Sequence, residues 1–398
     1  IPGASPYNVS DPTNGFQFVP GPITGRIPAL TVINPNLKMP ESRQFNLTFE
    51  RQIFWQSRLR LSYIGTRAVN LLQYTFDNLP ISPVYDPSSP FKVAADWMCA
   101  GTGQTISGVK IATTTACPNA VPIGDKEISI RVLRTNDRRP NPNASTNLVV
   151  NNGSKAWYNA AQVEWETGTY RGFQGRMTYT FSKAIDEGSE ATFVGQGDIN
   201  IFPPNDRYKK GLSRMDTRHR VTLVGTYELP WLRNRNDLIG SVLGGWQIST
   251  AARFASGSPF TIVDSGALDV DFDGVGNARP VVVDPAYSGG WHVTYPGNSQ
   301  AKVPKSAFRH PQYGDTYDDF IGRNTYYTDG VKNVDLGLYK TFQIARGYAL
   351  MFRLDAFNVF NQVTWWYPDN NFNSSTFMRL TANNYSPRLL QAGFRFIY

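Results

Sequence analysis

The sequence predicts an all-β fold: an antiparallel transmembrane β-barrel of the outer-membrane type with long extracellular loops. Three observations support this prediction: the composition, the recurrence of short segments in which polar and apolar residues alternate, and the alternation of short and long connections. Aromatic residues make up 13% of the 398 residues and charged residues only 18%, with 34 Gly and 27 Pro. This composition favours many strands joined by polar loops over a helical bundle.

The hydropathy agrees with such a barrel. The mean hydropathy is −0.35, and no stretch of the sequence is long and apolar enough for a spanning helix. Each strand of a membrane barrel presents only every second side chain to lipid, so its hydropathy is low even though it crosses the membrane.

Nine segments of six to ten residues show alternation with a period of two. The longer ones have the length of about ten residues that a tilted membrane strand needs. In the second segment, Leu59 and Leu61 share one face, and Arg58 and Arg60 lie on the other. The segments cover residues 44–53, 58–67, 158–166, 173–182, 220–228, 246–253, 333–338, 350–355 and 390–398. Soluble sandwiches also alternate, but here the polar face carries rows of Arg, Glu and Gln and the apolar face is rich in aromatic residues. That pattern is typical of strands between lipid and a wet lumen.

The connections between these segments alternate in length. Three are tight (54–57, 168–171 and 344–347), one is moderate (230–240), and the others are long (68–157, 184–217, 257–332 and 361–388). Short turns in the periplasm and long loops outside are the rule in outer-membrane barrels. We therefore expect the chain end to be periplasmic and the long connections to be extracellular.

This topology predicts the domain organisation. Residues 1–42 are expected to be an extracellular loop or a remnant of an upstream part of the barrel, and residues 43–398 the carboxy-terminal part of the barrel. Single-chain bacterial barrels have even strand numbers. We therefore expect about nine to twelve strands of a larger barrel, with further strands and a secretion signal upstream.

The charge distribution bears on possible partners. The formal net charge is +8, but the cations are not clustered as nucleic-acid binding requires. They lie singly along the predicted strands: Arg58, Arg60, Arg176, Arg220, Arg253, Arg353 and Arg395. We expect a charged barrel lumen and no nucleic-acid partner, with lipopolysaccharide phosphates as further contacts for cations near the outer rim.

Two loop segments contain candidate structural sites, one for a disulfide and one for a calcium ion. Cys99 and Cys117 lie in one Gly/Thr/Pro-rich segment, which in an exported protein predicts a disulfide; the alternative is two unrelated thiols. Asp269, Asp271 and Asp273 form a D-x-D-x-D-G run that is able to wrap calcium. Because Pro280 occupies the twelfth position, where an EF-hand has Glu, an acidic solvated loop is the alternative.

The last segment ends on an aromatic residue, with apolar residues at every second position before it: Leu390, Ala392, Phe394, Phe396 and Tyr398. It is similar to the targeting signal that the outer-membrane barrel assembly machinery recognises, although an ordinary amphipathic strand would show the same pattern. Aromatic residues of the long links, among them Trp365, Trp366 and Tyr367, are candidates for ligand stacking or for a membrane-interface girdle; the girdle is favoured for these three.

Five stretches of the sequence form an ordered set of motifs. They are Leu61-Ser-Tyr-Ile-Gly-Thr-Arg67, Tyr179-Thr-Phe-Ser-Lys-Ala-Ile-Asp186, Asp216-Thr-Arg-His-Arg220 followed by Glu228-Leu-Pro230, Gly244-Gly-Trp-Gln247 with Ala255-Ser-Gly-Ser-Pro-Phe260, and Arg353-Leu-Asp-Ala-Phe-Asn-Val-Phe-Asn361. In this order they resemble the carboxy-terminal barrel region of TonB-dependent receptors, specifically the Oar-like group that carries a carboxypeptidase-regulatory-like domain. The likeness spans roughly residues 40–398, with the long loops unmatched.

The resemblance implies a receptor in the bacterial cell outer membrane that takes up a large substrate, such as a siderophore, an oligosaccharide or a peptide. The family's plug and TonB box are not recognisable here, so contact with TonB is expected only through an upstream part. The alternatives are a surface-display or adhesion protein, and a smaller passive channel that needs extra strands, with residues 128–134 and 146–150 as candidates. His219 has no nucleophile elbow nearby, and we expect no enzymatic activity and no cofactor other than the calcium considered above.

Overall fold

The computed structural model describes residues 31–78, 147–189, 209–232, 237–265, 279–290, 303–311, 318–380 and 386–398. It also describes residues 141 and 235 and short strands between residues 98 and 132. The chain divides into two compact units: residues 1–34, 75–150 and 272–274 form one, and residues 35–74, 151–271 and 275–398 form the other.

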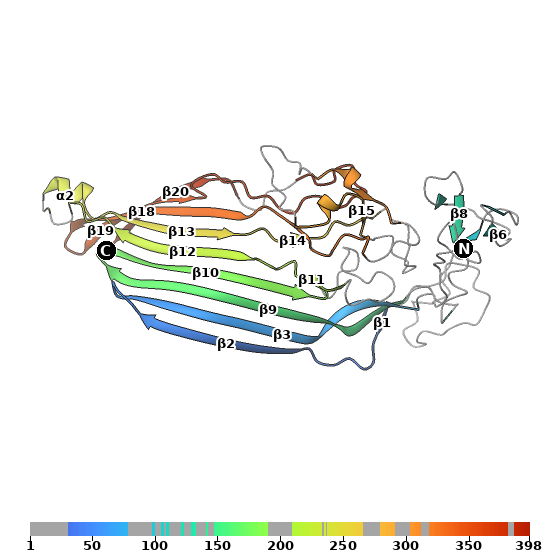
Figure 1. Ribbon diagram of the computed structural model, residues 1–398. Coiled ribbons are helices and arrows are strands. Elements are labelled where there is room, and N and C mark those ends of the chain that lie inside the picture. Colours follow the sequence, from blue (N-terminus) through green and yellow to red (C-terminus); the bar gives the residue numbers. More distant parts are fainter. Residues whose placement is uncertain are drawn as a thin grey trace, which may run out of the picture. The chain divides into compact units, whose positions relative to one another are not determined.

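One large antiparallel sheet dominates the described residues, and its long strands run side by side in Figure 1. The strand order along the sheet follows the chain, so that each long strand pairs with the next one. The strands are β2 (Glu41–Gln52), β3 (Ser57–Asp77), β9 (Asn147–Tyr170), β10 (Phe173–Asp186), β12 (His219–Glu228), β13 (Gln247–Ala255), β18 (Val331–Ala345), β19 (Tyr348–Phe357) and β20 (Leu389–Ile397). The sheet is open in the described residues, with β2 and β20 at its edges.

Each of the nine predicted segments coincides with one of these strands, with at most one residue beyond the strand's end, which confirms the predicted strand pattern. The predicted boundaries of the first long link were wrong, because residues 68–77 belong to β3 and residues 147–157 belong to β9. Asn70 has a positive φ of 56° within β3, and such an irregularity shifts which face the following side chains occupy. In β9, residues 148–150 are all apolar and residues 151–155 are polar or Gly, so this extension does not alternate. Residues 72–77 of β3 do alternate, but in the opposite phase to residues 58–67.

Tight turns close one end of the sheet. Trp55 and Gln56 link β2 to β3 with φ of 59° and 52°, and Arg171 and Gly172 link β9 to β10 with φ of 50° and 84°. Positive φ at both central residues is the geometry of the type I′ turn, whose twist matches that of paired strands. The β18–β19 turn uses Gly347, with a φ of 88°.

The link between β12 and β13 is longer and lies at the same end. It contains the helix α2 (Leu238–Leu243), and the side chain of Asp237 caps its N-terminus by accepting a hydrogen bond from the backbone N–H of Gly240 at 3.0 Å. Figure 1 shows α2 and the carboxyl terminus at the end of the sheet that has the tight turns. Within the described residues, no helix has the length and hydropathy needed to cross a membrane.

The candidate extra strands do not lengthen the sheet. Ser129–Val132 is β8, which pairs with β4 (Met98–Cys99) and β7 (Val121–Pro122) in a separate small sheet. Residues 147–150 are the beginning of β9, where β1 (Thr31–Ile33) pairs in parallel. The smaller passive channel therefore lacks the additional long strands that it requires in the described part of the chain.

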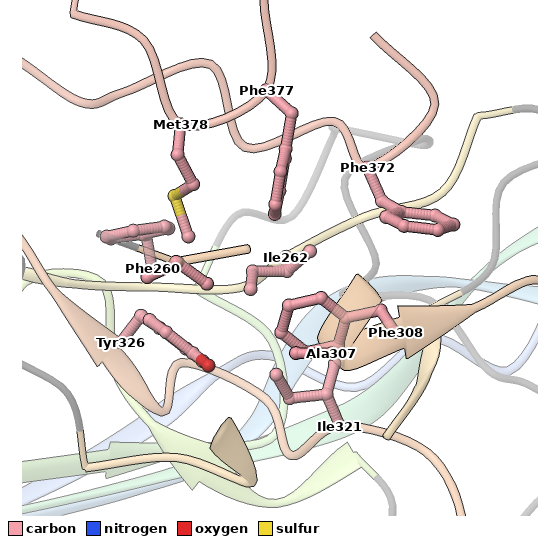
Figure 2. Packing of buried hydrophobic residues seen from close by; sticks show 10 residues of the cluster. Phe260, Ile262, Ala307, Phe308, Ile321, Tyr326, Phe372, Phe377 and Met378 are labelled. Carbon is pink, nitrogen blue, oxygen red and sulfur yellow. The ribbon is translucent and has the colours of Figure 1, made fainter. Parts of the chain in front are cut away.

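In the part of the chain that the structure describes, a cluster of buried apolar side chains lies in the long links. Short elements there are β11 (Gly211–Leu212), β14 (Pro259–Phe260), β15 (Val281–Val282), β16 (Phe308–Arg309), β17 (Tyr326–Tyr327) and the single turns η3 (Pro285–Tyr287) and η4 (Lys305–Ala307). Buried side chains from the β13–β18 and β19–β20 links pack together, as Figure 2 shows: Phe260, Ile262, Val303, Ala307, Phe308, Ile321, Tyr326, Phe372, Phe377 and Met378. These two links form one packed body, which we call the loop core.

Candidate functional site

The two faces of the main sheet differ in chemistry along its whole width. On one face the strand register places apolar side chains beside one another: Leu47 opposite Tyr63, Met177 opposite Trp165 and Leu223, Ile248 opposite Leu338, and Phe352 opposite Phe394. Many of these large side chains are exposed, among them Phe394 at 71% and Leu47 at 76%. A continuous exposed apolar face of this extent needs a covering such as lipid.

The opposite face carries a row of ion pairs across four strands. Glu50 on β2 accepts from Arg58 at 3.1 Å and from Arg60 at 2.9 Å, both on β3. Glu166 on β9 accepts from Arg58 at 2.6 Å and from Arg176 on β10 at 2.9 Å. Arg60 also reaches Glu164 at 3.1 Å. These side chains are partly exposed, so each ion pair contributes little to the stability of the fold. The row of ion pairs instead makes this face of the sheet charged and hydrated.

The polar face continues across β13, β18 and β19. Tyr339 donates its hydroxyl hydrogen to Asp355 at 2.8 Å, lies 3.1 Å from the Ser249 hydroxyl, and has Arg353 over its ring at 5.4 Å. Arg353 also pairs with Asp355. These residues and Arg176 line a hollow of about 570 Å³ on the polar face. The arrangement provides positive and negative groups with which water and polar solutes are able to form hydrogen bonds.

Beyond the sheet, a buried arginine ties two long links together. Arg323, in the β13–β18 link, donates to the backbone carbonyl of Asp186 at 2.8 Å and to that of Lys209 at 3.1 Å, and its guanidinium pairs with the Asp186 carboxylate. The Arg323 side chain is fully buried. Asp186 is the last residue of β10, so this pair fixes the start of the β10–β12 link against the loop core.

A small pocket of about 160 Å³ opens where three links meet. Arg214 comes from the β10–β12 link, Phe260 from the β13–β18 link, and Trp366 and Tyr367 from the β19–β20 link; Thr261, Asn324 and Asn370 complete the lining. Trp366 is 52% exposed, and the Arg214 guanidinium lies over the Tyr367 ring at 5.4 Å. Three aromatic and four polar residues line this pocket, and its volume suits one chemical group of a ligand and not a whole large ligand.

Asp216 is a buried acid in the β10–β12 link. Its side chain is buried, and burial raises the pKa of this carboxyl above its ordinary value, although the Ala184 N–H at 2.6 Å and Arg218 at 3.7 Å act in the opposite direction. One carboxylate oxygen, Oδ2, has no hydrogen-bond partner. Three residues further on, His219 Nδ1 lies 2.9 Å from the Tyr179 hydroxyl.

The predicted site residues have different outcomes. Leu390, Ala392, Phe394 and Phe396 lie on β20 along the apolar face, and Tyr398 follows the strand. Asp269, Asp271 and Asp273 lie outside the described residues, as does Cys117, and Cys99 is described only as part of the backbone of β4. The barrel-assembly signal, the calcium site and the disulfide therefore all stay predictions.

Sequence reasoning missed the Arg323 clamp and the pocket. Asp186 stands at the end of a quoted motif, but its partner lies 137 residues away, and no local pattern links the two. The sequence places Trp366 and Tyr367 in a long link and favours a membrane girdle for them. Their place in a pocket between three links instead favours the ligand-contact hypothesis.

Comparisons with known proteins give one family match. The family model described as "Outer membrane beta barrel domain" matches residues 2–391. Similar solved structures include the outer membrane transporter YddB from Escherichia coli, with 10% identity, a TM-score of 0.43, and coverage of 93% of this chain and 34% of that one. No match was found among curated proteins.

Two further similar structures are a pyoverdine receptor and an iron transporter. The pyoverdine receptor FpvA from Pseudomonas aeruginosa has 11% identity and a TM-score of 0.37, covering 93% of this chain and 31% of its own. The FrpB iron transporter from Neisseria meningitidis has 11% identity and a TM-score of 0.37, covering 92% and 32%. The chain thus spans about a third of the length of these solved structures.

Proposed function

The chain belongs to the outer membrane beta barrel domain family, and from this premise we propose that it forms the carboxy-terminal wall of a TonB-dependent receptor of the Oar-like group, which takes up a large substrate. The protein lies in the outer membrane. The observation that carries the proposal is the two-sided sheet, whose charged face is suited to a wet passage and whose apolar face is suited to lipid. The ordered motifs from Leu61 to Asn361 support the receptor group.

A wall is not a complete barrel. A sheet that spans a membrane has to close into a barrel, because the backbone N–H and C=O groups of an open edge find no water in lipid to bond to. We therefore place further strands between the open edges of β20 and β2, and the connection to TonB in a part of the protein outside this chain. The final strand, from Leu390 to Tyr398, serves as the contact for the barrel assembly machinery.

The packed links fit ligand capture. The loop core and the Arg323–Asp186 clamp hold three links in one arrangement, and the pocket at Trp366 opens between them. Preformed pockets bind with a smaller ordering cost than mobile loops do. The pocket is therefore our candidate for the first contact with a siderophore, an oligosaccharide or a peptide; calcium at Asp269, Asp271 and Asp273 would serve only to order the adjacent loop.

The experiment uses mass spectrometry to measure which compounds disappear from the growth medium. Three strains are compared: cells with the receptor gene, cells without it, and cells that lack TonB. The proposal predicts a compound class that only the first strain depletes, and a Trp366→Ala receptor present at normal levels that depletes it more slowly. Depletion that persists without TonB would indicate passive passage. Equal depletion with and without the gene, while the barrel is present at the surface, would favour surface display.

A further inference from the structure

The helix α2 is apolar on its exposed surface, although it lies in a link at the end of a barrel sheet. Leu238 is 82% exposed, Leu243 57%, Val242 48% and Ile239 47%. Trp231, earlier in the same link, is 70% exposed. Neighbouring apolar side chains with this exposure form a patch that water covers unfavourably, and such patches mark interaction surfaces.

The patch joins the apolar face of the sheet through Trp246. The Trp246 ring packs edge-to-face on Phe342 at 6.4 Å and on Phe352 at 5.9 Å, and its indole N–H donates to the carbonyl of Val242 in α2 at 3.2 Å. Phe342 and Phe352 belong to the apolar face of β18 and β19, where Phe352 is paired with Phe394. The patch on α2 is therefore continuous with the lipid-facing surface.

A buried lysine fixes this connection. Lys340 occupies an apolar-face position of β18, opposite Phe352, and is only 5% exposed. Its ammonium donates to the carbonyl of Gly244, just after α2, and lies over the rings of Phe342 at 5.0 Å and Trp246 at 5.8 Å. The ammonium thus donates to a carbonyl at the end of α2 and is shielded by two aromatic rings. These contacts stabilise a positive charge at the edge of a lipid-facing surface.

We propose that α2, with Trp231 and Trp246, is a membrane anchor that lies in the headgroup region of the periplasmic leaflet of the outer membrane. Short apolar helices with Trp at their flanks suit the boundary between headgroups and acyl chains. The occupant is phospholipid, because the patch continues a lipid-facing surface and lies at the end of the sheet that has the short turns. This proposal rests on the outer-membrane location and is independent of the ligand and of TonB.

The test places single cysteines at positions 238, 239, 242 and 243 in a Cys99→Ser/Cys117→Ser background, with Arg346→Cys as the matched control. Arg346 lies in the exposed β18–β19 turn at the same end of the sheet. Each variant of the full-length protein is labelled with a small fluorophore and reconstituted in phosphatidylethanolamine/phosphatidylglycerol vesicles, and heat-modifiability verifies that the barrel has folded. Quenching by lipids carrying a nitroxide near the headgroup is compared with quenching by aqueous iodide.

The anchor predicts several-fold stronger lipid quenching than aqueous quenching at the α2 positions, and the reverse at Arg346→Cys. Since no other protein is present, aqueous quenching of the α2 labels equal to that of Arg346→Cys would overturn the proposal. In a Leu238→Glu/Leu243→Glu variant, the label at position 242 should move from lipid to water while the barrel stays folded. Unchanged lipid quenching in this folded variant would also overturn it.

Discussion

Arg323, in the β13–β18 link, and Asp186, the last residue of β10, are joined through both the backbone and the side chain of the aspartate. The guanidinium donates to the Asp186 carbonyl at 2.8 Å and pairs with its carboxylate, and the Ser189 hydroxyl lies 2.8 Å from the same guanidinium. The arginine is fully buried. The pair therefore holds the loop core on the end of β10.

Removing the arginine should loosen this body. Arg323→Met keeps much of the side-chain volume but leaves the Asp186 carboxylate without its partner, which typically costs about 3–5 kcal/mol at a buried pair. We expect faster proteolysis of the links and a lower unfolding midpoint in detergent. Arg43→Met, which removes an exposed pair with Glu41, is the control and should have little effect. Equal sensitivity of the two variants would show that the clamp does not order the loops.

The glycine turns should differ in their tolerance of a methyl group. Gly172 and Gly347 both have positive φ, of 84° and 88°, but an added Cβ at Gly172 would lie 2.8 Å from the carbonyl oxygen of Glu228, whereas nothing lies within 4 Å at Gly347. Backbone strain alone should make Gly347→Ala cost about 1 kcal/mol. Gly172→Ala should cost more in urea unfolding of the folded barrel, because the neighbouring backbone has to shift. A smaller loss for Gly172→Ala than for Gly347→Ala would contradict the turn geometry.

Asp216 should make the stability of the loops depend on pH. Burial raises the pKa of its carboxyl in the folded state, so the folded state binds this proton more tightly than the unfolded state does. The contribution of Asp216 to stability is therefore largest at acid pH and falls as the pH rises from the ordinary pKa of Asp to the raised one. Asp216→Asn removes this dependence and should unfold at the same or a higher temperature at neutral pH. A marked loss of stability in Asp216→Asn at neutral pH would count against the assignment.

The cysteines give a simple chemical prediction. If Cys99 and Cys117 are paired, the unfolded protein should contain no reactive thiol before reduction and two after it. Thiol counting with and without a reductant measures this directly. Two reactive thiols in the unreduced protein, purified without reductant, would show that no disulfide forms.

The main sheet could be predicted from the sequence because lipid on one side and water on the other impose a strict alternation. Segments such as 173–182 carry this pattern fully and match β10. The extensions of β3 and β9 do not continue the pattern of their strands, because Asn70 breaks the alternation in β3, and β9 has an apolar run at 148–150 followed by a polar run at 151–155. The loop core and the Arg323 clamp depend on contacts between residues far apart in the chain, and the local sequence does not encode which side chains meet.

The central claim is that the nine strands separate lipid from a wet interior, and a spin-label scan along β12 tests it most directly. Single labels at Val221, Leu223 and Tyr227 should be accessible to oxygen dissolved in the bilayer, and labels at Thr222, Val224 and Thr226 to a water-soluble nickel chelate, in the full-length protein reconstituted in vesicles. Val224 is the informative position, because it is apolar in sequence but lies on the polar face opposite Arg176. A period of two in accessibility, with Val224 on the water side, would match the account. Uniform accessibility along the strand, or Val224 in lipid, would contradict it.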